Sequence, residues 1–254
     1  MFLLKNKERN EDMPIIYGRN AVKELILSEK TINKVYLQKG LRELGEIKKI
    51  ALDKKIIVVD SDKFKLDKLA EGGTHQGIIA SYTEYTYYDV EDILEYSKSK
   101  NENPFIIILD KIEDPHNLGA IIRTAECMGV HGIIIAKRNA CAITDTVEKV
   151  AAGACSYMRV ARVANITETL KKLKKEGIWV YGLDMDGETE IYNYDLGGPI
   201  AIVVGNEGEG ISRLVKENCD AILKIPMRGT INSLNASVSV GMTIYEVSRQ
   251  NATK

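Results

Sequence analysis

The stretch "FIIILDKIEDPHNLGAIIRTAECMGVHGIIIA" (residues 105–136) has the pattern of a strand, a helix and a second strand. Two candidate strands, 105–110 and 132–136, each built on a continuous apolar run, flank the segment 117–128, which we expect to be helical. Apolar runs without alternation are typical of strands buried on both faces, and a helix is the usual connection between parallel strands. The stretch therefore predicts a parallel α/β unit.

The same alternation continues to the C-terminus. We expect further buried strands at 157–163, 179–184, 200–205 and 221–227, and helices at 144–155, 166–176, 208–218 and after Asn235. Strands that alternate with helices in this way indicate a parallel sheet covered by helices on both faces.

The N-terminal third has the pattern of a smaller α/β unit, from Ile15 to about Tyr82. Helices are predicted at 19–30, 43–55 and 62–72, and strands at 32–38, 56–60 and 76–85. The polar run "SKSKNENP" (97–104) is the best boundary between two domains. The predicted organisation is a disordered leader (1–13), a small α/β domain (14–83), an acidic linker (84–103) and a larger α/β domain (104–254).

Composition excludes several classes of protein. The chain is 44% hydrophobic and 28% charged, which is typical of soluble globular proteins. It contains no apolar run long enough to cross a bilayer, and its start, "MFLLKNKERNEDMP", has no cleavage site for secretion, so we expect a cytoplasmic protein. None of the four cysteines lies in a CxxC pair, so we expect neither a metal site nor a disulfide framework.

Charge is unevenly distributed along the chain. The net charge is −1, but residues 1–83 carry 16 Lys and Arg against 12 Asp and Glu, whereas residues 84–103 carry 2 against 6. A mildly basic N-terminal domain is compatible with an RNA partner, although basic solvated surfaces are common.

Three predicted strands are followed by unusual polar segments, and the ends of parallel strands are where ligands bind. The first segment holds Asn117 and Arg123, and it could be only a helix capped by Asn117 with a surface arginine. The second, "GNEGEG" (205–210), could be only a Gly-rich turn, because its G-x-x-G-x-G spacing is not a dinucleotide fingerprint. The third, "GTINSLNASVSVG" (229–241), could be a helix start capped by Asn235 or Ser233, which leaves other polar residues unexplained.

Together the three segments resemble the sequence motifs of the SpoU (TrmH-type) RNA 2′-O-ribose methyltransferases, which belong to the SPOUT class. The matching stretches, in order, are "NLGAIIRTAECMGV" (117–130), "IVVGNEGEGIS" (202–212) and "IPMRGTINSLNASVSVG" (225–241). In the N-terminal domain, "IYGRNAVKELI" (16–26) and "GGTHQGIIA" (72–80) are similar to the substrate-binding domain of the branch that modifies a guanosine in bacterial 23S rRNA.

This resemblance implies a fold, a cofactor and partners. The larger domain would be a parallel-sheet α/β domain whose C-terminal part forms a deep trefoil knot, preceded by a small RNA-binding domain. The cofactor would be S-adenosyl-L-methionine. The partners would be large-subunit ribosomal RNA and a second copy in a homodimer, with no membrane and no DNA.

The resemblance also implies roles for individual residues. The catalytic group would comprise Arg123, Glu207, Asn235, Asn117 and Ser233, and the cofactor would contact Gly205, Ile225, Met227, Leu234 and Leu183. Arg123 would act either as the base or by polarising the ribose hydroxyl while water or phosphate accepts the proton, because arginine gives up a proton reluctantly. Possible RNA contacts in the small domain are Arg19, Lys23 and His75.

Three other functions stay open at this point. The substrate could be transfer RNA instead of ribosomal RNA, or the protein could bind RNA without catalysis on the same fold. A dinucleotide-dependent oxidoreductase is disfavoured by the glycine spacing and by Glu207 and Glu209, which would repel a diphosphate.

Overall fold

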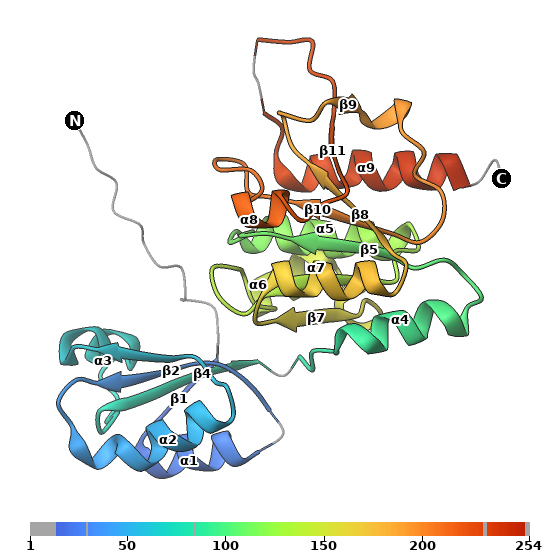
Figure 1. The fold of residues 1–254 in the computed structure, drawn as a ribbon. Helices are drawn as coiled ribbons and strands as arrows, with labels where there is room; N and C mark the ends of the chain where they lie inside the picture. The colour runs from blue at the N-terminus through green and yellow to red at the C-terminus, as the bar shows by residue number, and fades with distance from the viewer. Residues whose placement is uncertain (1–13, 29, 84, 231–232, 252–254) are drawn as a thin grey trace. The chain divides into compact units, whose positions relative to one another are not determined.

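The computed structural model describes residues 14–28, 30–83, 85–230 and 233–251. These residues divide into two units (Figure 1). The small unit comprises residues up to Thr86 together with Ile143–Asp145, and the large unit comprises Tyr87–Ala142 and the chain from Thr146 onward. Each unit is described by itself.

The small unit is built on a four-stranded sheet of order β1-β4-β2-β3. Strand β4 is antiparallel to β1 and to β2, whereas β2 and β3 are parallel. Helices α1 and α2 pack on one face of the sheet and α3 packs on the other (Figure 1). The bounds are β1 (Ile15–Tyr17), α1 (Arg19–Leu27), β2 (Thr31–Gln38), α2 (Gly45–Asp53), β3 (Val58–Ser61), α3 (Lys63–Leu69) and β4 (Ile78–Thr83).

The large unit contains a seven-stranded sheet of order β7-β6-β5-β10-β8-β11-β9. Every pair of neighbouring strands is parallel, which confirms the predicted parallel sheet. All residues of β5 and β10 are buried, as continuous apolar runs require. The bounds are β5 (Phe105–Leu109), β6 (Gly132–Ala136), β7 (Val160–Val163), β8 (Trp179–Leu183), β9 (Thr189–Glu190), β10 (Ile200–Val204) and β11 (Ala221–Lys224).

Helices cover both faces of the larger sheet. Apolar side chains of α4, α7 and α8 share one core cluster with the sheet, while α5 and α9 lie side by side on the other face (Figure 1). Among the described residues, no helix is both long enough and apolar enough to cross a membrane. The bounds are α4 (Val90–Ser99), α5 (Pro115–Cys127), α6 (Asp145–Ala151), α7 (Ile166–Lys175), α8 (Arg213–Lys216) and α9 (Ala236–Asn251).

The acidic segment 84–103, expected to be a linker, contributes a helix to the large unit. Ile93 of α4 is fully buried in the core cluster of the sheet. Gly132 provides the space for it, since a Cβ on that glycine would lie 2.5 Å from Ile93 Cδ1. The acidic residues of α4 lie on its exposed side, so the helix is amphipathic.

Two helix starts differ from the predictions. Helix α5 begins at Pro115 and is capped by Asp114, whose Oδ1 accepts from the backbone N–H groups of His116 and Asn117. Asn117 therefore lies inside the first turn and is not the cap. Helix α8 covers only Arg213–Lys216 of the predicted 208–218, because a Gly-rich turn occupies the preceding residues.

Candidate functional site

A cavity of about 570 Å³ opens at the carboxyl edge of the large sheet. It is lined by the ends of β8 and β10, by the segments that follow β5, β10 and β11, and by the start of α9. The residues predicted to bind a cofactor all line it: Leu183, Gly205, Ile225, Met227 and Leu234. This location follows the general rule that parallel sheets bind ligands beyond the carboxyl ends of their strands.

The Gly-rich turn after β10 forms one wall of the cavity and folds back on itself. The N–H of Gly210 donates to the carbonyl of Asn206 at 3.0 Å, and the Asn206 side-chain oxygen accepts from the N–H groups of Gly208 (2.9 Å) and Glu209 (2.7 Å). A Cβ on Gly205 would lie 2.0 Å from the carbonyl carbon and oxygen of Gly210. The turn can close only because no side chain is present at Gly205.

Two aspartates hold this turn from the strands on either side of β10. Asp110 follows β5 and is buried, and its Oδ2 accepts from the N–H of Ser212 at 2.7 Å. Asp184 follows β8, and its Oδ2 accepts from the N–H of Ile211 at 3.3 Å. Neither residue was selected from the sequence. The available signal was that the predicted strands 105–110 and 179–184 both end in Leu-Asp.

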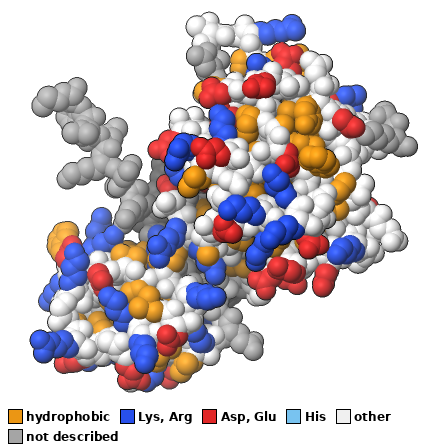
Figure 2. Space-filling model, in the orientation of Figure 1, with side chains coloured by type: hydrophobic (Ala, Val, Ile, Leu, Met, Phe, Trp, Pro, Cys, Tyr) orange, Lys and Arg blue, Asp and Glu red, His pale blue; other side chains and the backbone are white. Residues whose placement is uncertain are grey.

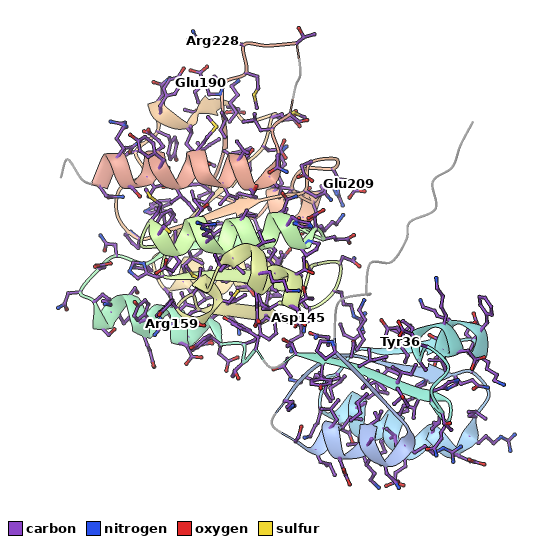
Figure 3. The ribbon with its side chains drawn as sticks, turned by 180° about the vertical axis from the view of Figure 1, so that it is seen from behind. Tyr36, Asp145, Arg159, Glu190, Glu209 and Arg228 are labelled. Atoms are coloured by element: carbon purple, nitrogen blue, oxygen red, sulfur yellow. The ribbon has the colours of Figure 1, made fainter. Side chains whose placement is uncertain are left out.

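Two lysines that line the cavity, Lys111 and Lys216, form ion pairs there. Lys111 Nζ donates to Glu209 Oε2 at 2.7 Å, which raises the pKa of Lys111 and lowers the pKa of Glu209 (Glu209 is labelled in Figure 3). Desolvation acts against the charge of Lys216, but Asp186 at 3.1 Å and Asp184 at 3.3 Å raise its pKa overall. The cavity therefore combines an apolar wall with fixed charges of both signs.

Three of the predicted catalytic residues form one hydrogen-bonded network. Glu207 Oε1 accepts from Asn117 Nδ2 at 2.8 Å, from Asn235 Nδ2 at 3.0 Å and from the N–H of Ala236 at 3.2 Å. Asn235 Nδ2 also donates to Asn117 Oδ1 at 2.8 Å. The Asn235 Oδ1 accepts from the N–H groups of Ser237 and Val238, so Asn235, one of the two candidates, caps α9. One residue from each sequence motif thus meets at this point.

The other two predicted catalytic residues lie outside this network. Ser233 is exposed and lines the cavity. Arg123 is exposed on α5 and does not line the cavity, and its side chain makes no hydrogen bond or ion pair with another described residue. Arg123 is six residues beyond Asn117, so the two side chains leave the helix in different directions.

The three possible RNA contacts of the small unit are engaged within the unit. Arg19 pairs with Glu43, and Lys23 Nζ lies 2.8 Å from Glu46. His75 is buried, with Nε2 2.8 Å from Asp67 and Nδ1 accepting from the N–H of Gly77. The imidazole of His75 therefore orders the turn before β4.

The thiols do not add chemistry to the site. Burial raises the pKa of Cys141 and of Cys219 to about 12, which leaves the nucleophilic thiolate unpopulated at neutral pH. Within the described ranges no three His, Cys, Asp or Glu side chains are grouped so that they could hold a metal ion.

Replacement of Gly205 with alanine is expected to lower the free energy of unfolding by about 2–3 kcal/mol, because the new Cβ overlaps backbone atoms that cannot move independently. Calorimetry should show a melting temperature lower by roughly 5–10 °C. Gly208→Ala is the matched control, since its nearest neighbour would be Asn206 Oδ1 at 3.6 Å. Equal melting temperatures for the two variants would contradict the close approach at Gly205.

Comparisons with known proteins follow the division into two units. Residues 104–245 match the family described as "SpoU rRNA Methylase family", and residues 15–88 match "RNA 2'-O ribose methyltransferase substrate binding". A "Putative TrmH family tRNA/rRNA methyltransferase" of Staphylococcus haemolyticus is 45% identical over 93% of this chain and 95% of its own length. A protein of Bacillus subtilis, "Putative TrmH family tRNA/rRNA methyltransferase YacO", is 43% identical over 92% and 95%.

Solved structures show the same fold. The SpoU methyltransferase AviRb of Streptomyces viridochromogenes, in complex with the cofactor AdoMet, superposes with a TM-score of 0.61. The two chains are 22% identical, and the match covers 98% of this chain and 94% of AviRb. A putative RNA methyltransferase of the TrmH family from Porphyromonas gingivalis superposes with a TM-score of 0.58 and 22% identity, over 94% and 91% of the two chains.

Proposed function

Since the chain belongs to the SpoU rRNA methylase family, and is therefore an RNA 2′-O-ribose methyltransferase, we propose that its substrate is a guanosine of 23S rRNA. The methyl donor in this proposal is S-adenosylmethionine. The observation that carries the reaction is the network of Asn117, Glu207 and Asn235, which unites all three motifs beside the cavity. The choice of ribosomal RNA is supported by the description of the family that the large unit matches, and the small unit, which matches a substrate-binding family, supports RNA as the substrate.

The cavity fits the proposed cofactor in size and in chemistry. Its volume of about 570 Å³ lies within the usual range for cofactor sites. Leu183, Ile225 and Leu234 supply an apolar wall for an adenine ring. S-adenosylmethionine supplies a methyl group bound to a positively charged sulfur. The solved AviRb complex supports this assignment at the level of the fold.

The chain's own residues must orient and activate a ribose hydroxyl. A 2′-hydroxyl is a poor nucleophile until its proton is leaving, so a base or a strong polariser is required. Glu207, held by the amides of Asn117 and Asn235, presents a fixed carboxylate beside the cavity. Arg123 polarises the hydroxyl and binds the neighbouring phosphate, because a guanidinium already holds its proton at neutral pH and so cannot readily accept another.

Part of the proposal concerns assembly and topology. Helix α9 exposes Val238, Met242 and Tyr245, which are spaced so that they share one helix face. This apolar stripe supports a homodimer, in which Arg123 on the adjacent α5 would lie near the contact between copies.

The position of β10 between β5 and β8, with β11 beyond β8, supports the proposed trefoil knot. An enzyme acting on ribosomal RNA would work in the cytoplasm.

The test of the substrate is a map of 2′-O-methylated positions in total RNA from cells with and without the gene. We expect one guanosine of 23S rRNA to lose its methyl group in the deletion strain, and the purified protein with S-adenosylmethionine to restore it. Loss of a methyl group from a transfer RNA, with 23S rRNA unchanged, would replace the proposed substrate with the alternative. Loss at no position would overturn both.

A further inference from the structure

We propose that the carboxyl edge of the small sheet binds unpaired RNA nucleotides, with Phe64 stacking on a base and the cations Lys39, Arg42 and Lys63 lying along the phosphates. The proposal rests on the proposed function only for the choice of RNA as the ligand. It assigns a specific surface and a stacking residue to the small unit.

The topology of the small unit brings four separate segments to this edge. Strands β1, β2 and β3 all run in the same direction, because β1 and β2 are both antiparallel to β4 and β3 is parallel to β2. The segments after β1, β2 and β3 therefore lie beside the turn that precedes β4. Backbone bonds tie them together: the N–H of Lys39 donates to Ser61 at 2.9 Å, and the N–H of Gln38 donates to Gly77 at 2.8 Å.

Phe64 is a large apolar side chain on the solvent side of its helix. It is 80% exposed, whereas Leu66 is fully buried and Ala70 is 5% exposed in the core cluster beneath α3. Residues two apart on a helix point about 200° away from each other, so Phe64 cannot share the buried face with Leu66. Tyr36 (labelled in Figure 3) lies on the sheet face that α3 covers.

The helix that carries Phe64 is fixed in place. Asp62 caps α3, with its Oδ1 accepting from the N–H of Lys65 at 2.8 Å. Leu66 anchors the helix in the core. The aromatic ring is therefore presented to solvent from a rigid element, which lowers the conformational entropy lost when a base stacks on it.

A second aromatic ring and open backbone lie at the same edge. Tyr17, at the end of β1, is 40% exposed. Its ring packs against Gly73, since a Cβ on that glycine would lie 2.4 Å from Tyr17 Cζ. Gly40 and Gly72 are exposed, and no atom lies within 4 Å of the Cβ position of either. The edge thus offers two ring faces and accessible backbone groups.

The charge at this edge suits a polyanion. Lys39, Arg42 and Lys63 are exposed, while the nearby Glu43 is paired with Arg19 and Asp62 is occupied as a helix cap. Figure 2 shows lysine and arginine side chains interspersed with hydrophobic patches on the visible face of the small unit. Exposed rings among cations are the usual composition of surfaces that bind unpaired nucleic acid.

The experiment measures binding of the full chain to a labelled, unstructured single-stranded RNA of about 16 nucleotides by fluorescence anisotropy. The comparison ligand is a duplex of the same sequence. We expect Phe64→Ala to raise Kd for the single strand by roughly tenfold and to change Kd for the duplex much less, because only an unpaired base can stack on the ring. Leu52→Ala is the matched control, since Leu52 is 53% exposed on α2 but lies near the opposite edge of the sheet.

Two further variants distinguish stacking from a general apolar contact. Phe64→Trp should bind the single strand as the wild type does, whereas Phe64→Leu should behave like Phe64→Ala. Lys39→Ala should reduce by about one the slope of log Kd against log salt, as expected for one lost phosphate contact. Wild-type affinity in Phe64→Ala or in Phe64→Leu, or an equal loss on the duplex, would overturn the proposal.

The outcome is separable from that of the proposed function. If methyl transfer is absent but the affinity for RNA depends on Phe64, the proposed binding surface is supported and the proposed function is contradicted. If the wild type methylates 23S rRNA and Phe64→Ala binds and methylates RNA as the wild type does, the proposed binding surface is contradicted and the proposed function is supported.

Discussion

Replacement of Glu207 with alanine should lower kcat for methyl transfer by about 100-fold. Glu207 Oε1 is the shared acceptor for the side chains of Asn117 and Asn235 and for the N–H of Ala236. Without it these donors lose their common partner, and only the hydrogen bond from Asn235 to Asn117 still ties the start of α9 to α5. Misplacement of reacting groups by about 1 Å is sufficient for a loss of this size.

The measurement is the steady-state rate of transfer of a labelled methyl group to rRNA at saturating cofactor and RNA, which gives kcat. Glu207→Gln keeps an acceptor oxygen without the charge, so it separates the positioning of the two asparagines from the charge itself. Glu176→Ala is the control, because Glu176 is an exposed carboxylate after α7, at the opposite edge of the sheet. An unchanged kcat in Glu207→Ala, in a protein with wild-type melting temperature, would remove this network from the mechanism.

Replacement of Arg123 with alanine should lower kcat by about 1,000-fold or more, within the range for loss of a group that assists proton transfer. The fold should be unaffected, since the side chain of Arg123 is exposed and has no hydrogen bond or ion pair to another described residue. Arg123→Lys should restore only a small part of the activity, because an ammonium lacks the planar fork that binds phosphate in two places. The control is Lys175→Ala, which removes an exposed cation at the end of α7.

The position of Arg123 outside the cavity of its own chain adds a test of assembly. If the arginine acts on the cavity of a partner, mixing Arg123→Ala and Glu207→Ala proteins should restore part of the activity, because a mixed dimer holds one intact site. Full activity in Arg123→Ala alone would contradict the role proposed for this residue. Absence of restoration in mixed dimers would assign Arg123 to the cavity of its own chain.

Much of the large unit was predictable from local patterns. The strand at 132–136 was predicted with the bounds that the structure shows, because it is a short apolar run between turns. The two-residue β9 and the three-residue β1 were missed, since strands of this length have no measurable periodicity. Helix α8 was predicted too long because Gly-rich turns and helix starts share polar residues.

The cofactor contacts were predictable from the resemblance to the SpoU motifs, which implied Leu183, Gly205 and Ile225. All three line the cavity, which lies where the rule that ligands bind beyond strand ends expects a ligand. No such rule indicated that His75 would be buried, because the pairing with Asp67 forms only when the turn before β4 packs beside α3.

By itself, the sequence determined the parallel α/β class, the division into a small and a large part, and the chemical groups that follow each strand. Periodicity reports how each element is buried, and this information is local. Only the tertiary structure decided that β10 lies between β5 and β8, which lets Asp110 and Asp184 hold the Gly-rich turn. Strand order depends on the packing of the whole chain, so the meeting of Asn117, Glu207 and Asn235 across up to 118 positions could not be derived from any one segment.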